Sequence, residues 1–205
     1  EHTTNLREIL GDSEKGFQYK IKSGAQAGGL AGRLSNSEVT NSFAATLIEG
    51  STLSIGGLVG EAEHTSINQS YAASYLKGKS ASGLIGSISG TNQISNSYAV
   101  GFIESLANGK AAGLCLGKGT ADINNAYSAM LFTSNNQVTN YSLCETSSIY
   151  HNVYYLESDL FHFVNINPEC GRSYEELTDL DKIADMFDSN VFEEKDALRT
   201  KPYNL

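Results

Sequence analysis

The sequence is poor in several residue types, and each shortage narrows what the chain can be. The 205 residues include no Trp and only two Pro. Basic residues number 14 against 23 acidic ones, so the chain offers no positive surface for a phosphate backbone and we expect no nucleic-acid partner. No apolar run approaches the roughly 18 residues of a membrane helix, so we expect no membrane insertion. The chain starts at Glu1 without an initiator Met or a signal peptide, and we interpret it as part of a longer chain.

Cysteine is also scarce. Cys115, Cys144 and Cys170 are odd in number, which does not indicate a disulfide scaffold, and their spacings (29 and 26) fit no zinc pattern. Cys115 and Cys144 occupy equivalent positions in the repeat described below, so a disulfide is possible by proximity. Stacked parallel neighbours have poor geometry for such a bridge, and we favour free, buried thiols.

The sequence also lacks the usual catalytic motifs. None of its four histidines is followed by Glu, which excludes a His-Glu-x-x-His zinc site. Gly78-Lys79-Ser80 resembles the end of a phosphate loop, but Ala73 stands where that loop needs its first Gly. In residues 86–90, Ile88 stands where a nucleophile elbow needs Ser. We therefore predict no catalytic residues, no metal ligands and no cofactor.

What the sequence has instead is an internal repeat of about 27 residues. A Gly-Gly-Leu-x-Gly string recurs in four clear copies, and a weaker copy without the glycines supplies a fifth Leu. Each string is followed by an Ile-x-Asn-Ser-Tyr-Ala string. The recurring positions are Leu30, Leu58, Leu84, Leu114 and Leu143; Val39, Ile67, Ile94 and Ile123; Asn41, Gln69, Asn96, Asn125 and Asn152; and Phe17, Phe43, Tyr71, Tyr98, Tyr127 and Tyr154.

A coil of this length divides into about three short strands with corners, which is the size of one rung of a parallel β-helix. Several Gly in every repeat disfavour helix, at about 1 kcal/mol each against Ala. We therefore predict an all-β repeat fold, a right-handed parallel β-helix or β-solenoid of about five coils over residues 17–155. Equivalent residues then stack about 4.8 Å apart and form columns.

The columns have different expected roles. The Leu column and the Val/Ile column are core ladders, and the Gly positions mark corners that need a positive φ or close backbone approach. The amide column can hydrogen-bond from coil to coil. The aromatic column shares a strand face with the Ile column unless a corner intervenes at the amide, and we favour a core stack over an exposed stripe for binding sugar or protein.

The two strings together resemble the GLUG repeat, which occurs in large bacterial surface proteins, including adhesins and the N-terminal regions of IgA-specific metalloendopeptidases. The resemblance covers about residues 24–155, and four copies carry it. It implies a secreted or cell-surface location and no catalytic residues. The cysteines and the missing glycines near Leu143 depart from the pattern.

The ends of the chain differ from the repeat. Residues 156–205 hold one of the 20 Gly and 12 of the 23 acidic residues, and we predict that they form an acidic C-terminal cap. Ser173 and Glu176 form a capping box for an amphipathic helix over about 174–188. Its apolar face is Leu177, Leu180, Ile183, Ala184 and Phe187, opposite Glu175, Asp179 and Asp181. Residues 1–16 are either a cap or the edge of an earlier coil.

Three functions fit these features. The first is a non-catalytic structural or adhesive module, extracellular or on a bacterial cell surface, that binds a host protein or glycan. The second is a substrate-holding, non-catalytic region of a large secreted IgA-type metalloprotease. The third is a carbohydrate-active β-helix, for which Glu61, Glu63 and His64 form the only dense acid–histidine cluster. Because these three residues lie between the repeat strings, we expect a surface loop there and no enzyme.

Overall fold

The computed structural model describes residues 20–133, 137–146, 148–158, 161–164, 168–178, 182, 186 and 187. The strands pair in parallel, each with its equivalent one repeat later in the chain. The result is a β-solenoid of about five turns, as the repeat predicts. Residues 1–16 and Phe17 lie outside the described residues.

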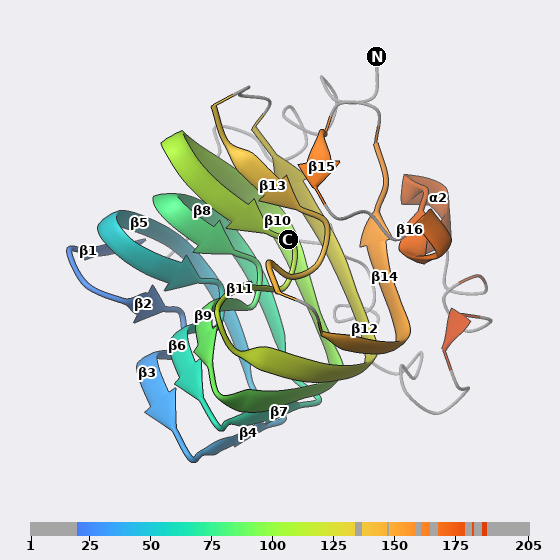
Figure 1. The fold of residues 1–205 in the computed structure, drawn as a ribbon, viewed down its shortest axis with the longest axis horizontal. Helices are drawn as coiled ribbons and strands as arrows, with labels where there is room; N and C mark the ends of the chain where they lie inside the picture. Colours follow the sequence, from blue (N-terminus) through green and yellow to red (C-terminus); the bar gives the residue numbers. More distant parts are fainter. Residues whose placement is uncertain are drawn as a thin grey trace.

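The coils follow one another along the solenoid axis (Figure 1). The first described coil contains β1 (Lys20–Ser23), β2 (Ala27–Gly28), β3 (Ala31–Ser35) and β4 (Glu38–Thr40). The second contains β5 (Phe43–Gly56), β6 (Val59–Glu63) and β7 (Ser66–Asn68), and the third starts with β8 (Tyr71–Ser82) and β9 (Ile85–Ser89). The long strands β10 (Thr91–Ala112) and β12 (Thr120–Phe132) each end one coil and begin the next, with β11 (Cys115–Gly117) between them.

The chain ends its last coil with β13 (Thr139–Tyr141) and β14 (Ile149–Leu156). Four short elements follow: β15 (Phe163–Val164), the 3-10 helix η1 (Pro168–Cys170), β16 (Gly171–Arg172) and helix α2 (Tyr174–Thr178). Two sheets result. The larger has the path β1-β5-β8-β10-β12-β14-β16, and the smaller is β3-β6-β9-β11. Figure 1 shows the nested arcs of the larger sheet and the short strands of the smaller one.

The two aliphatic columns form the interior of the coils. Leu58, Leu84 and Leu114 are fully buried, whereas Leu30 in the first coil is 48% exposed. The Val/Ile column is also buried, and its members pair in register from coil to coil: Val39, Ile67, Ile94 and Ile123. Both predicted core ladders are therefore confirmed, and only the outermost Leu is uncovered.

The repeated glycines allow close backbone approach between coils. A Cβ at Gly60 would lie 2.5 Å from the carbonyl oxygen of Gly32, a distance that real Cβ atoms do not reach. The Gly columns were expected to provide either a positive φ or close backbone approach, and close approach is the general role. Among their described members, only Gly117 has a positive φ, at 111°. It is the last Gly of the fourth copy, which carries one inserted residue before it.

The left-handed corner belongs to the amide column. Its five members, Asn41, Gln69, Asn96, Asn125 and Asn152, all have φ between 49° and 52°. Asn adopts this region more readily than most non-Gly residues. The amide of Asn152 donates to Oδ1 of Asn125 at 3.1 Å, and the amide of Asn125 donates to Oδ1 of Asn96 at 3.2 Å. The predicted coil-to-coil amide ladder is confirmed for these three residues. Asn96 instead donates to Asn68 at 3.0 Å.

This corner reverses the face on which the following residue lies. The aromatic column packs in a second hydrophobic cluster, separate from the one that contains the Ile column. Its rings stack with centroids 4.8–5.2 Å apart and interplanar angles of 3–8°. Tyr98 and Tyr127 are buried, whereas Phe43 is 57% exposed. The rings stack as expected, but only part of the column is buried, and the left-handed amide is the intervening corner that separates it from the Ile column.

The prediction of free thiols at Cys115 and Cys144 is wrong, because these residues form a disulfide. Their Cα atoms are 4.8 Å apart, within the range of about 4.4–6.8 Å that disulfides span. Cys144 lies in an isolated bridge to Cys115 rather than inside a continuous strand. The two residues pair directly as a parallel bridge, so the stacked register that was expected to disfavour the bond accommodates it. Cys170 is the remaining described cysteine and is buried and free.

The C-terminal segment packs beside the aromatic column (Figure 1). Helix α2 begins with the predicted capping box: the Glu176 N–H donates to Ser173 Oγ at 3.3 Å, and the Ser173 N–H donates to Glu176 Oε2 at 2.8 Å. Leu177 and Phe187 are buried in the cluster that contains Tyr98 and Tyr127. Leu180, Ile183 and Ala184 lie outside the described residues, so the extension of the helix to 188 stays a prediction.

Candidate functional site

The acid–histidine cluster begins on a strand, not in a loop. Glu61 and Glu63 are the third and fifth residues of β6, and the intervening Ala62 is fully buried. The two carboxylates therefore leave the same face of the strand, as period-two alternation requires. His64 follows with φ 49° and turns the corner. The expected surface position is confirmed, and the expected loop is wrong for both glutamates.

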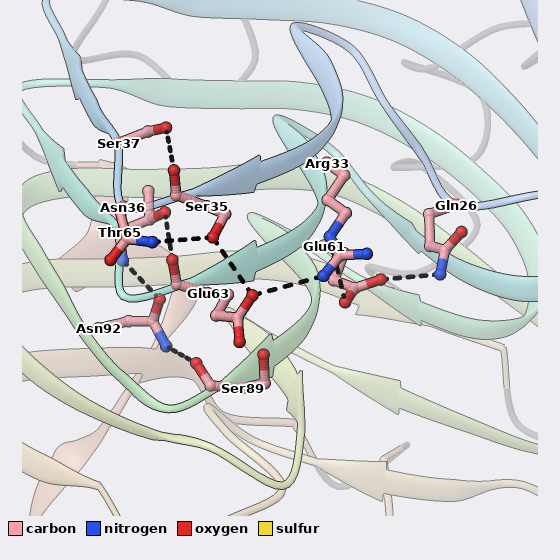
Figure 2. A network of polar contacts seen from close by, with 10 residues as sticks. All are labelled: Gln26, Arg33, Ser35, Asn36, Ser37, Glu61, Glu63, Thr65, Ser89 and Asn92. Carbon is pink, nitrogen blue, oxygen red and sulfur yellow. Dashed lines mark hydrogen bonds and ion pairs between the residues drawn. The ribbon is translucent and has the colours of Figure 1, made fainter.

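Both carboxylates are held by residues of the preceding coil (Figure 2). Arg33 Nε lies 3.7 Å from Glu61 Oε1, and Arg33 Nη2 lies 3.4 Å from Glu63 Oε2. Gln26 donates to Glu61 at 2.7 Å, and Ser35 donates to Glu63 at 3.2 Å. One guanidinium therefore joins two carboxylates, a geometry that suits the several N–H donors of Arg.

Glycoside hydrolysis usually needs two carboxyl groups that face each other across a groove. In the strand register, Glu61 lies between Arg33 and Ser87, and Glu63 lies between Ser35 and Ser89. Among the described strands beside β6, neither position therefore brings an acidic partner to Glu61. The neighbouring strands thus add no carboxylate to Glu61 and Glu63, which share one face of β6 and both lie beside Arg33.

His64 and the buried Asn92 form hydrogen bonds at the corner that follows β6. Asn92 is 1% exposed; its Oδ1 accepts a hydrogen bond from the Thr65 N–H at 3.0 Å, and its amide donates to the Ser89 carbonyl at 2.9 Å. His64 Nδ1 accepts from the Thr91 N–H at 3.4 Å. The contacts of Asn92 with Thr65 and of His64 with Thr91 join successive coils, and Figure 2 shows Asn92 between Thr65 and Ser89.

A second group of charges forms a column along the larger sheet. Lys22 pairs in register with Glu49, Glu49 with Lys77, and Lys77 with Glu104, so the sign of the charge alternates from coil to coil. Ion pairs join Lys22 to Glu49 at 3.5 Å and Lys77 to Glu104 at 2.7 Å. The hydrogen bond from Lys20 holds the pKa of Glu49 below its ordinary 4.5.

An open pocket of about 480 Å³ lies beside this charge column, lined by Lys22, Ser23, Gly24, Glu49, Gly50, Lys77 and Leu106. The corners next to it differ in length, because the register of β8 shifts against β5 and against β10 there. Leu106 lies within the longer corner of β10 and is 39% exposed. The pocket therefore combines charges of both signs with one exposed aliphatic side chain.

Sequence reasoning missed Arg33 and the charge column. Arg33 lies one repeat before Glu61, its register partner, and each member of the charge column lies one repeat before the next. These intervals match the period of the Leu and Ile columns, so the signal was present. It was overlooked because the residue type changes at each step.

Cys170 is a potentially reactive group outside the acidic cluster. Burial raises the pKa of the Cys170 thiol, which disfavours the thiolate nucleophile. Among the described residues there is no group of three or more His, Cys, Asp or Glu that could hold a metal ion. No helix in the described segments is long and apolar enough to cross a membrane. Comparison with protein-family models, curated proteins and solved structures finds no match.

Proposed function

We propose that the chain is a non-catalytic structural or adhesive module of a secreted or cell-surface bacterial protein. The observation that carries the proposal is that the repeated residues are engaged in stacking between coils. Leu58, Ile67 and Tyr98 are buried against their equivalents, and the acidic cluster is held by Arg33. The residues that vary between coils, at the corners and around the pocket, stay available for binding. The resemblance to the GLUG repeat supports the surface location.

The proposal predicts binding without turnover. The purified 205-residue chain would be screened against arrays of host extracellular proteins and glycans, and each bound ligand would be followed for cleavage. We expect specific binding that Leu106→Asp weakens at the pocket. Ile149→Asp is the matched control, because Ile149 is also an exposed aliphatic residue, at 60% against 39% for Leu106. Both variants should keep the melting temperature of the parent chain, since surface changes cost little.

Two results would overturn the proposal. Time-dependent cleavage of a bound glycan or protein would make the chain an enzyme. Failure of antibodies against the chain to label intact cells that produce it, or to detect it in the medium, would contradict the surface location. Sequencing the gene downstream for a His-Glu-x-x-His motif would test the alternative of a protease region.

A further inference from the structure

In the described part of the chain, the first coil forms an edge of both sheets, through β3 in the smaller sheet and β4 in the larger one. Among the described strands, β3 pairs with β6 alone and β4 pairs with β7 alone. Leu30 is 48% exposed, although its column is otherwise buried from Leu58 onward. We name β3, β4 and Leu30 the first-coil edge. An exposed edge of this kind is a template for an added strand.

The hydrogen bonds between later coils show which backbone groups this edge presents. Each Leu carbonyl from Leu58 to Leu114 accepts from the Leu N–H one coil earlier, at 2.9–3.0 Å. The N–H groups of Ser66 and Gln93 likewise donate to carbonyls of the preceding coil, both at 3.0 Å. The equivalent groups in the first coil are the Leu30 carbonyl and the Glu38 N–H. Neither has a partner among the described residues, so both are directed at the position of an added strand.

The charge of the first coil differs in sign from that of the chain. Residues 20–42 contain Lys20, Lys22, Arg33 and Glu38, three basic residues and one acidic, for a net charge of +2, whereas the whole chain carries −9. Lys22 is 72% exposed and Arg33 is 61% exposed. Arg33 reaches Glu61 and Glu63 through Nε and Nη2. Its Nη1 has no partner in the described segments and stays available for another carboxylate.

The sequence before the edge does not supply another copy of the repeat. One period before Leu30 stands Thr3, and one period before Val39 stands Asp12, when the period is taken as about 27 residues. A strand that continued the buried columns would need aliphatic residues at both positions. At this spacing Thr3 and Asp12 therefore do not extend the two buried columns, and residues 1–19 lie outside the described residues.

We propose that the first-coil edge binds an acidic, extended peptide of another chain as an added parallel strand. The peptide would place an aliphatic side chain on Leu30 and carboxylates beside Arg33, as β6 already does from the other side. Backbone hydrogen bonds would supply affinity and the side chains would supply specificity. The inference goes beyond the proposed function, since it concerns this edge wherever the chain is located.

Other occupants fit the edge less well. A second copy that met it edge to edge would bring two basic first coils together. Head-to-tail stacking would require a free last coil, but there β14 pairs with β16 and β13 pairs with β15. A sugar would stack on an aromatic ring, and β3, β4 and Leu30 contain none.

The test uses the full chain and a synthetic peptide with the sequence of residues 57–68, which carries Leu58, Glu61, Glu63 and Ile67. Titration calorimetry should show saturable binding, and amide exchange should show new protection at the Glu38 N–H. Arg33→Glu should weaken binding about tenfold. Lys118→Glu is the matched control: Lys118 is exposed, lies between β11 and β12, and should leave binding unchanged. A peptide with Lys in place of both glutamates should bind at least tenfold more weakly.

Three outcomes would overturn the proposal. The first is absence of peptide binding to the full chain. The second is equal affinity for the parent chain and Arg33→Glu, or binding that leaves Glu38 unprotected. The third is a concentration-dependent dimer that Arg33→Glu dissociates, since the occupant would then be a second copy. Circular dichroism and melting of each variant would confirm that the solenoid is intact.

Discussion

At the last coil, β14 pairs with β16, and Phe187 contacts Tyr127 and Tyr154 with centroid distances of 6.1 and 5.4 Å. At the first coil, β3 and β4 have described partners on one side only. The same columns run through both ends of the described part, and at the last coil the segment after the repeat covers them. That C-terminal segment supplies strands, a capped helix and apolar side chains to the closed end.

The two ends also differ within a single column, the aromatic one. In the aromatic column, Phe43 is 57% exposed and Tyr127 is 1% exposed, although both stack on their neighbours. Arg172 adds a cation–π contact to Tyr154 at 4.3 Å from the ring centroid. Stacking therefore sets the geometry of the column, and covering by the C-terminal segment sets its burial.

The largest expected effect is the difference in unfolding free energy between truncations at two positions of the Leu column. Leu84→Ala should lower the free energy of unfolding by about 4 kcal/mol, because it leaves a cavity among fully buried neighbours. Leu30→Ala should cost less than about 1 kcal/mol, since about half of its side chain is already exposed. Denaturant unfolding of the two variants would measure the difference. Equal losses would show that the first-coil edge is covered in solution.

The disulfide should stabilise the closed end. Its two cysteines are separated by 29 in sequence and join the fourth and fifth coils, and the loss of chain entropy for such a loop predicts about 3 kcal/mol. We expect Cys144→Ser to lower the unfolding free energy by that amount, and dithiothreitol to do so in the parent chain but not in Cys144→Ser. Cys170→Ser is the control that keeps the disulfide. Thiol titration in denaturant should find one free thiol in the oxidised parent chain; finding three would contradict the bridge.

Phe187 should shield Tyr127 and Tyr154, whose rings it contacts, from solvent. Phe187→Ala should destabilise the chain by about 3 kcal/mol, because Phe187 is a buried member of its cluster. Since the chain has no Trp, its fluorescence comes from tyrosine, and acrylamide quenching should increase when Tyr127 and Tyr154 lose their cover. Phe43→Ala at the exposed end of the column is the control. Equal quenching in both variants would mean that Phe187 does not cover the column.

The repeat made much of this fold predictable. Leu58, Leu84 and Leu114, together with the Val/Ile column, defined the register, because a residue that recurs at a fixed interval in a solenoid stacks on its own copies. The capping box at Ser173 was readable for a similar reason: it depends on local hydrogen bonds within one turn. Patterns that are local or strictly periodic were therefore recoverable from the sequence.

The features that could not be predicted depend on conformation or on residues that change along a column. The φ of Asn96 decides on which face Tyr98 lies, and no count of spacing reveals a left-handed residue. The Cys115–Cys144 bridge depends on an isolated contact beyond a regular strand. In the acidic cluster, Glu61 was predictable but its partner Arg33 was not. Similar residues one repeat apart reveal a column, whereas here an Arg is followed one repeat later by a Glu.

The smallest expected effect is on the pH dependence of stability. It concerns two carboxylates with lowered pKa values, Glu49 and Glu176, one near each end. Lys20 lowers the pKa of Glu49 mainly through a side-chain hydrogen bond, whereas the backbone N–H of Ser173 is the main cause of the lowered pKa of Glu176. A carboxyl group with a lowered folded pKa stabilises the fold above its unfolded value near 4.5, and this contribution is lost as the pH falls through the folded pKa. Both side chains are partly exposed to solvent, so each contribution should stay below about 1 kcal/mol at neutral pH.

The two contributions should differ in their response to salt. Glu49→Gln removes ion pairs with Lys20 and Lys22, so its cost should shrink at high ionic strength, where exposed charges are screened. Glu176→Gln retains a side-chain oxygen that can accept from the Ser173 N–H, so its smaller cost should vary less with salt. Unfolding free energies at pH 7 and pH 3, each at low and high salt, would measure both. A Glu176→Gln cost that salt removes as fully as that of Glu49→Gln would assign Glu176 to long-range charge rather than to the helix cap.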